Sequence, residues 1–132
     1  MSTAVTHDVH VEVAAAFVAD RSSPEDDEYF FAYTVLISNH GATTVQLLRR
    51  HWIITDGNGR IDEVRGPGVV GQQPVLKPGE TFQYTSACPL PTPRGTMHGT
   101  YEMVRDDGSR FDAAIAPFEL AAPTDGRPRY LN

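Results

Sequence analysis

The sequence is poor in the residues that cross-link a chain or carry it through a membrane. Its 132 residues include one cysteine and one tryptophan. With Cys88 as the single thiol, no disulfide can form within the chain, and a domain without disulfides suits a reducing compartment. No apolar run approaches the roughly 20 residues that cross a bilayer, and the first residues lack the basic and apolar regions of a secretory signal. We therefore expect a cytoplasmic protein without membrane insertion.

Positive charge is scarce as well. The chain has 11 lysines and arginines against 17 acidic residues, which gives a formal net charge of −6. Proteins that bind nucleic acid usually carry a basic excess, so nucleic acid is not an expected partner. Segment 49–80 differs from the rest, because it holds five cationic and four acidic side chains. A locally basic segment in an acidic chain can mark an anion site.

Strand-forming sequence, by contrast, is abundant. Segments rich in alternating apolar residues follow one another, joined by turns that contain glycine, proline, asparagine and aspartate. These segments are 7–17, 29–39, 44–55, 60–65, 82–88, 97–105 and 110–120. No window shows a helical repeat. About seven strands with such turns predict an all-β fold, an antiparallel β-sandwich of the immunoglobulin-like or fibronectin type III-like kind.

The chain has the length of one domain. With 40% hydrophobic residues, 132 residues can bury a sufficient core. We expect a single domain over 1–132, with its core in about 7–120. The prolines and glycine in 121–132 predict a loose tail there.

Two of the expected strands break their own alternation. In 44–55, Val45 and Leu47 fall on the face of Ile53, whereas Leu48, Trp52 and Ile54 fall on the opposite face. This predicts a bulge near Arg49 and Arg50, or burial on both sides. Near the end of the chain, Pro117 shifts the apolar face, as in an edge strand or at a bulge. Trp52 itself is expected to pack in the core between the sheets.

Three glycines in the basic segment form the pattern G-x-G-x-x-G. In dinucleotide-binding folds this pattern joins a strand to a helix, but the following segment 69–76 contains a proline and has no helical face. The local part of the mechanism can still operate, because glycines can turn successive N–H groups toward one anion. We therefore expect phosphate binding by Gly66, Gly68 and Gly71, with charge supplied by Arg65. The alternative is that the glycines only shape a connection between the sheets.

The other candidate residues do not predict a metal centre or a catalytic site. His7 and His10 are three apart on an expected strand, so their side chains leave opposite faces. The acidic run 25–28 offers oxygen ligands for Mg²⁺ but lacks the spacing of a dedicated loop. Cys88 and Ser86 lie outside any nucleophile signature, and Cys88 is better interpreted as a small buried thiol. We expect a protein that is not an enzyme.

Several stretches frame the glycine triplet. They are VQLL at 45–48, RHWIITD at 50–56, EVRG at 63–66, QPVL at 73–76, YTS at 84–86, CPL at 88–90 and MHGTYEM at 97–103. Together they resemble the ApaG family of small bacterial proteins over nearly the whole chain outside its two ends. The resemblance implies a fibronectin type III-like or immunoglobulin-like sandwich. It also implies a role in cobalt resistance and in the efflux of Co²⁺ and Mg²⁺, which must be indirect because such a chain cannot itself form a pore.

Two functional hypotheses follow. The first is a non-enzymatic protein that binds pyrophosphate or a nucleotide polyphosphate at the loop 65–71, with Mg²⁺ or Co²⁺ accompanying the phosphate as the only expected cofactor. The alternative is a protein–protein interaction module without a small-molecule ligand, which docks through a sheet edge or a loop. Similar domains fused into larger eukaryotic proteins, including F-box proteins, favour the second hypothesis. An exposed edge strand could also pair with a second copy and form a homodimer.

Overall fold

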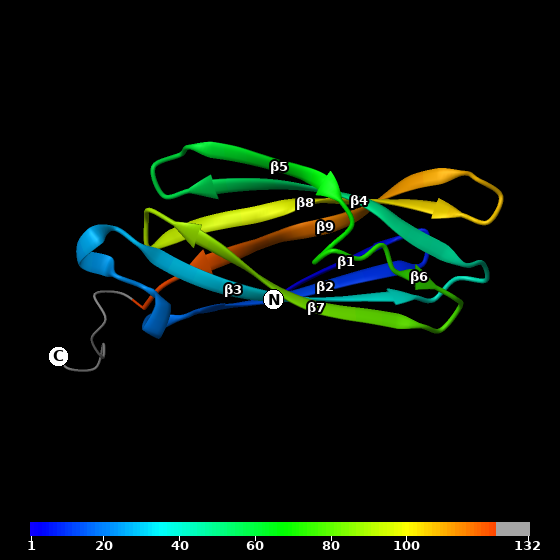
Figure 1. The fold of residues 1–132 in the computed structure, drawn as a ribbon, viewed down its shortest axis with the longest axis horizontal. Helices are drawn as coiled ribbons and strands as arrows, with labels where there is room; N and C mark the ends of the chain where they lie inside the picture. The colour runs from blue at the N-terminus through cyan, green and yellow to red at the C-terminus, as the bar shows by residue number, and fades with distance from the viewer. Residues whose placement is uncertain (124–132) are drawn as a thin grey trace.

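The structure, a computed structural model that describes residues 1–123, consists of two antiparallel β-sheets packed face to face (Figure 1). The first sheet has the strand order β1-β2-β3-β7 and the second β5-β4-β8-β9, with the short β6 paired to β4. The strands are β1 (Ser2–Thr6), β2 (Val9–Phe17), β3 (Tyr29–Asn39), β4 (Val45–Asp56), β5 (Ile61–Pro67), β6 (Val75–Leu76), β7 (Thr81–Leu90), β8 (Arg94–Arg105) and β9 (Arg110–Ala121). Two short 3-10 helices, η1 (Ala19–Arg21) and η2 (Pro24–Asp26), join β2 to β3. The predicted β-sandwich is confirmed.

At its start the chain differs from the expectation, and most of its end lies outside the described residues. The strand expected from residue 7 begins at Val9, because His7 and Asp8 have positive φ angles of 46° and 67° and form a tight turn. The turn leads back to β1, which pairs with β2 along its length. β1 is mostly polar, so apolar alternation did not indicate it. The expected tail at 121–132 lies outside the described residues apart from its first three, of which Ala121 ends β9.

The core lies between the sheets and is centred on Trp52. The residue is 2% exposed, and its ring meets those of Tyr33, Tyr101 and Phe118 edge-on at centroid distances of 5.3, 6.2 and 5.9 Å. Aromatic rings attract one another in this arrangement because the positive edge of one faces the negative face of the other. Trp52 is thus a core residue, as predicted.

A bulge in β4 decides which side chains face the core. The pairing between β4 and β8 skips Leu48, so the predicted bulge is confirmed one residue before the expected position. Because side chains alternate along a strand, one extra residue reverses the face of all that follow. After Leu48, Arg50 lies on the same face as buried Trp52, whereas Arg49 and His51 lie on the outward face.

β9 shows the irregularity predicted at Pro117. Its register with β8 shifts where Ala116 and Pro117 stand opposite His98. β9 is also the last strand of its sheet. The N–H that proline lacks is therefore not needed for pairing with a further strand on the outer side.

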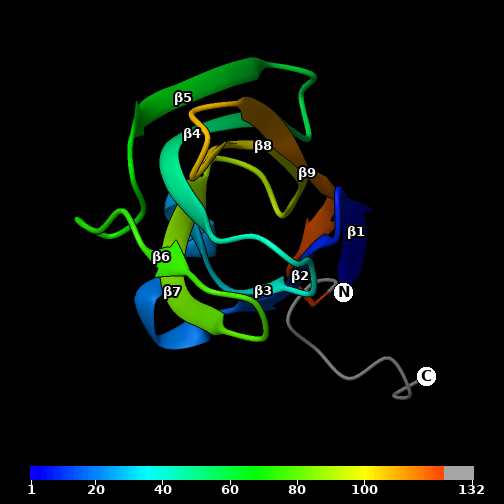
Figure 2. The same ribbon diagram turned by 90° about the vertical axis from the view of Figure 1, so that its right-hand side faces the viewer.

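The two layers meet on one side of the sandwich and stay apart on the other. β9 packs beside β1 and β2 (Figure 2). On the opposite side, β5 and β7 are the outermost strands of their sheets, and residues of both line a cleft. This open side and the outward face of β4 hold the two candidate sites.

Candidate functional site

The glycine triplet spans the end of a strand and a tight hairpin. Gly66 belongs to β5, which ends at the next residue. Beyond it, Val69 and Gln72 exchange two backbone hydrogen bonds of 2.8 Å. Val70 and Gly71 form the tip, with φ angles of 43° and 79°. Positive φ at both central residues is the geometry of a type I′ turn, which suits the glycine well.

Gly68 gives this segment its shape. Its N–H donates to the carbonyl of Leu48 at 2.8 Å, which ties the hairpin to the bulge in β4. Its φ is 62°, and a Cβ atom here would lie 2.2 Å from the carbonyl oxygen of Gln72. Any side chain at position 68 would therefore disturb the hairpin itself. A Gly68→Val variant cannot separate a binding role from this structural one.

Arg50 holds the segment from the inner side. Its Nη1 donates to the carbonyl oxygens of Pro67 and Gly68, both at 3.0 Å. Gly66 stands opposite Arg50 on β5, and a Cβ atom on Gly66 would come within 3.0 Å of Arg50 Nη2. The segment therefore points the carbonyl oxygens of Pro67 and Gly68 toward the guanidinium of Arg50. Because Gly66 has no side chain, it leaves room for that guanidinium.

A groove, here called the outer groove, crosses the outward face of the second sheet. Its volume is about 350 Å³. It is lined by Arg49, Arg50, His51, Arg65, Gly66, Pro67, Thr100, Glu102 and Asp112. In the register of the sheet, Arg49 stands opposite Glu102, which in turn stands opposite Asp112. Neighbouring strands are separated by roughly 4.8 Å, so these charges form a row across β4, β8 and β9.

Of the four residues predicted to bind phosphate, the structure brings two together in the outer groove. Arg65 and Gly66 line it from β5. Gly68 is buried, and Gly71 lines another cavity, beside Tyr33. The four residues therefore do not surround one point.

One carboxylate organises the charges at the β5 end of the outer groove. Glu63 Oε1 accepts a hydrogen bond from His51 Nε2 at 2.8 Å and from Arg65 Nη2 at 3.1 Å. The hydrogen bond from His51, and then the charge of Arg65, lower the pKa of Glu63. Arg49 forms no ion pair within residues 1–123, so its guanidinium is free to bind a ligand there.

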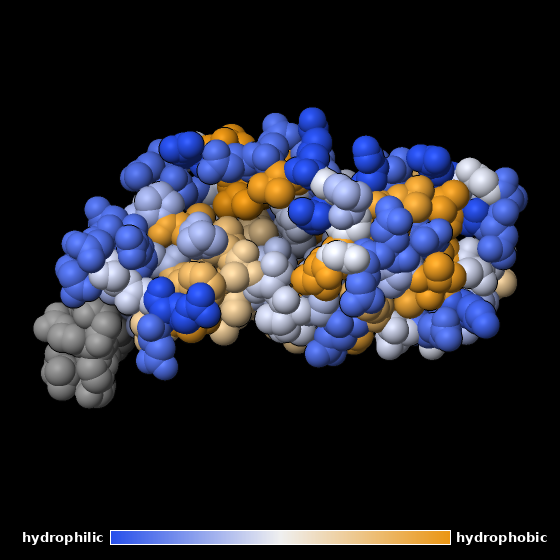
Figure 3. All heavy atoms as spheres, in the orientation of Figure 1, coloured by the Kyte–Doolittle hydropathy of each residue, from blue (hydrophilic) through white to orange (hydrophobic). Residues whose placement is uncertain are grey.

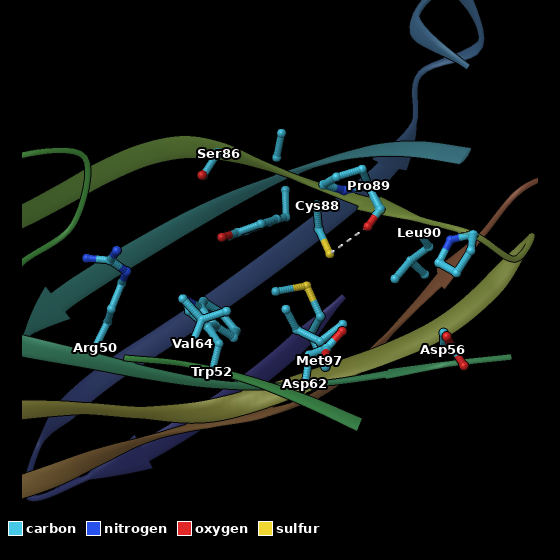
Figure 4. A pocket seen from close by; sticks show the side chains of 14 residues that line it. Arg50, Trp52, Asp56, Asp62, Val64, Ser86, Cys88, Pro89, Leu90 and Met97 are labelled. Carbon is cyan, nitrogen blue, oxygen red and sulfur yellow. Dashed lines mark hydrogen bonds between the residues drawn. The ribbon is translucent and has the colours of Figure 1, made fainter. Parts of the chain in front are cut away.

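A second cavity, here called the inner cleft, lies between the sheets at the open side of the sandwich (Figure 4). Its volume is about 310 Å³. The residues that line it include Tyr33, Arg50, Trp52, Val64, Ser86 and Cys88. An adjoining cavity of about 220 Å³ shares Tyr33, Arg50, Trp52 and Ser86 with it and is bordered by the hairpin at Val69–Gly71. Arg50 thus stands where the two cavities meet.

Cys88 is expected to react slowly with thiol reagents while the protein is folded. It is 5% exposed, and burial, with a smaller contribution from Asp62, raises the pKa of its thiol to about 11. At pH 8 the thiolate fraction is then about a hundredfold below that of a thiol with a pKa of 9.0. We expect alkylation by iodoacetamide to be slower by at least that factor and to accelerate as the pH rises toward 11. Urea-unfolded protein is the control, and equal rates in the two states would contradict the prediction.

The sequence patterns identified only some of the residues that line the outer groove. Arg65 and Gly66 were singled out because they adjoin the glycine pattern. Arg49, Thr100 and Glu102 were not, because they come from different strands and meet only through the pairing of β4 with β8. The only sequence feature that pointed to Arg49 was the broken alternation at 44–55. A bulge there allows the side chains of Arg49 and Arg50 to lie on faces that regular alternation would not assign to them.

The other candidate ligands do not assemble. His7 packs on the ring of Phe111, and His10 on that of His40. Within residues 1–123, no group of three or more His, Cys, Asp and Glu side chains is placed to hold a metal ion. No helix of that part of the chain is long and apolar enough to cross a membrane.

The strand order and the two cavities define an antiparallel β-sandwich with a charged groove on one sheet. A family model described as the ApaG domain matches residues 19–105. Protein ApaG of Paramagnetospirillum magneticum is 55% identical over 129 residues, 98% of either chain, and Protein ApaG of Bordetella pertussis is 56% identical over 117 residues, 89% of either chain. A crystal structure of a Bordetella pertussis protein named ApaA superimposes with a TM-score of 0.86 at 55% identity, covering 91% of this chain and 98% of that one. The chain belongs to the ApaG family.

Proposed function

We propose that this ApaG protein is a non-enzymatic cytoplasmic protein that binds a polyphosphate, together with a divalent cation, in the outer groove. The observation that carries the proposal is the row of charges across this face. Arg49 and Arg65 lie toward β5, and the carboxylates of Glu102 and Asp112 lie toward β9. A metal-bound polyphosphate has the complementary pattern, with anionic oxygens at one end and a cation at the other.

The chemistry of each group suits this role. A guanidinium binds phosphate oxygens through two parallel N–H donors, and Arg49 has no competing ion pair among the described residues. Mg²⁺ in proteins is usually held by one or two carboxylates together with phosphate oxygens, which the ligand could supply. Glu102 Oε2 pairs with Arg110 at 3.6 Å, which leaves Oε1 and the carboxylate of Asp112 as the protein oxygens for the cation. Gly66 lines the groove beside Arg65, and Gly68 and Gly71 contribute by shaping the hairpin that follows. Co²⁺ also accepts imidazole, which His51 offers.

This role would link the protein to Co²⁺ and Mg²⁺ homeostasis without transport. A protein that retains metal-bound pyrophosphate or a nucleotide changes the free concentration of the metal ion or of the nucleotide. It needs no acid–base pair and no nucleophile. Burial of Cys88 and its raised pKa argue against nucleophilic chemistry at this thiol.

The prediction is that pyrophosphate with Mg²⁺ binds saturably and shifts the backbone amide resonances of Arg49, Arg65, Gly66 and Thr100. Arg65→Ala and Arg49→Ala should each weaken binding by about tenfold, because each removes charge-assisted hydrogen bonds to the phosphate at an exposed site. The measurement is an NMR titration with pyrophosphate, with and without Mg²⁺ or Co²⁺.

Arg60→Ala is the matched control for this titration. Arg60 lies on the same β4–β5 hairpin, is 74% exposed and pairs with Asp62, but it does not line the groove. Binding to the Arg60→Ala variant should equal that of the unmodified protein. An equal loss in all three variants, or no saturable shift at millimolar pyrophosphate, would remove the assignment.

The alternative function, a protein–protein interaction module, is favoured by the exposed edge of β5. This strand ends its sheet, and its Ile61 and Val64 are 62% and 39% exposed. On the face seen in Figure 3, hydrophobic surface reaches the solvent between hydrophilic side chains. Such an edge can pair with a strand of another protein or of a second copy. Two results together would favour this function. The protein should dimerise or capture one stoichiometric partner and lose this interaction in the Val64→Lys variant, and pyrophosphate should cause no shift in the NMR titration.

A further inference from the structure

The inner cleft contains a guanidinium edge that the protein does not use. Both hydrogen bonds that Arg50 makes to residues 1–123 leave from Nη1, toward the carbonyls of Pro67 and Gly68. Nε and Nη2 have no protein acceptor in that part of the chain. These two groups form one edge of the guanidinium, with two parallel N–H donors that match the two oxygens of a carboxylate.

The surroundings of this edge are mostly apolar. Figure 4 shows Arg50 at one end of the cleft, with Ser86 on β7 across from it and Trp52 and Val64 beside it. Trp52 is 2% exposed, and Val64 is 39% exposed and so borders the opening. An interaction with a charge is stronger where protein excludes water, so an acid bound here gains more from Arg50 than it would at the surface.

The far end of the cleft limits the charge that a ligand can carry. Asp62 lines it there, paired with Arg60 at 3.5 Å, and Asp56 lines it as well, accepting hydrogen bonds from the backbone of its own turn. A second negative group on the ligand would approach these carboxylates. One acidic group on an apolar body is therefore the best match.

We propose that the inner cleft binds a small amphipathic monocarboxylic acid, with its carboxylate on the Nε–Nη2 edge of Arg50 and its apolar part against Trp52 and Val64. A volume of about 310 Å³ suits a small ligand of this kind. Arg50 lines both the inner cleft and the outer groove, but Trp52, Val64 and Ser86 line the inner cleft and not the outer groove, and these residues set the two sites apart. The inner-cleft proposal does not depend on the polyphosphate proposal.

The test compares 3-phenylpropionate with its neutral amide, 3-phenylpropionamide, on the unmodified protein. The acid should shift the indole N–H of Trp52, the side-chain Nε–H of Arg50 and the amides of Ser86 and Cys88, and it should bind at least about tenfold more tightly than the amide. Equal binding of acid and amide, or shifts confined to the outer groove, would overturn the proposal.

Two variants locate the site. Arg50→Gln should weaken binding of the acid by about tenfold or more and leave binding of the amide unchanged. Because Arg50 also holds the carbonyls of the hairpin, Ser86→Leu provides an independent check from β7, since the larger side chain fills the cleft and leaves Arg50 in place. Ser86→Leu should abolish binding of 3-phenylpropionate, whereas Arg65→Ala should leave it unchanged. Retention of the acid's affinity in the folded Ser86→Leu protein would overturn the proposal.

Discussion

Replacement of Gly99 by alanine is expected to lower the free energy of unfolding by about 3 kcal/mol or more. Gly99 stands opposite Trp52 in the pairing of β8 with β4. A Cβ atom on it would lie 1.9 Å from the carbonyl oxygen of His51 and 3.1 Å from the Cα atom of Trp52. Both atoms belong to the backbone of a central strand, so the clash can be relieved only by moving β4 away from β8. Guanidinium denaturation followed by the fluorescence of Trp52 measures the loss.

Gly71→Ala is the control for this effect. Gly71 has a φ of 79°, but no atom beyond its own residue and its two chain neighbours lies within 4 Å of the position that its Cβ would occupy. The substitution therefore carries only the cost of a left-handed conformation, about 1 kcal/mol. If the two variants lose equal stability, contact between strands β4 and β8 does not explain the glycine at position 99.

The second large effect is expected for Trp52→Ala, which should destabilise the protein by about 3–5 kcal/mol. The indole fills the space between the sheets and contacts the rings of Tyr33, Tyr101 and Phe118. These rings belong to β3, β8 and β9, so the substitution leaves a cavity that the sandwich cannot close without shifting both layers. Since the variant lacks the only tryptophan, far-UV circular dichroism must follow its unfolding.

Ile61→Ala supplies the comparison for an apolar side chain outside the core. Ile61 is 62% exposed on the edge strand β5. Its truncation should change the free energy of unfolding by no more than about 0.5 kcal/mol. A loss below about 1 kcal/mol for Trp52→Ala, close to that of Ile61→Ala, would show that Trp52 does not hold the two sheets together.

Both large effects and both candidate sites depend on β4. The strand contributes Trp52 to the core, Arg50 to the inner cleft and Arg49 to the outer groove. Variants that weaken the core at Trp52 or Gly99 are therefore expected to impair ligand binding indirectly. Binding experiments should instead use Arg49 and Arg65, which are exposed, or Ser86, which is partly buried.

Residue patterns alone were enough to predict the class of fold and the burial or irregularity of several single positions. Apolar alternation and turn residues act locally, over a few neighbours, so they were sufficient to predict an antiparallel sandwich. Burial of Trp52 and Cys88 followed from their residue types on such strands. The irregularity at Pro117 could be predicted because proline lacks the N–H that a regular strand needs.

The positions of the arginines relative to the two cavities, by contrast, depend on contacts between distant parts of the chain. The pairing of β4 with β8 placed the bulge at Leu48, and this position sends Arg49 outward and Arg50 inward. The N–H of Gly68 is directed to Leu48, a residue twenty positions away, rather than to an external anion. Local pattern cannot reveal such contacts, because they depend on the register between strands and on the distance between sheets. Both are set by packing over the whole chain.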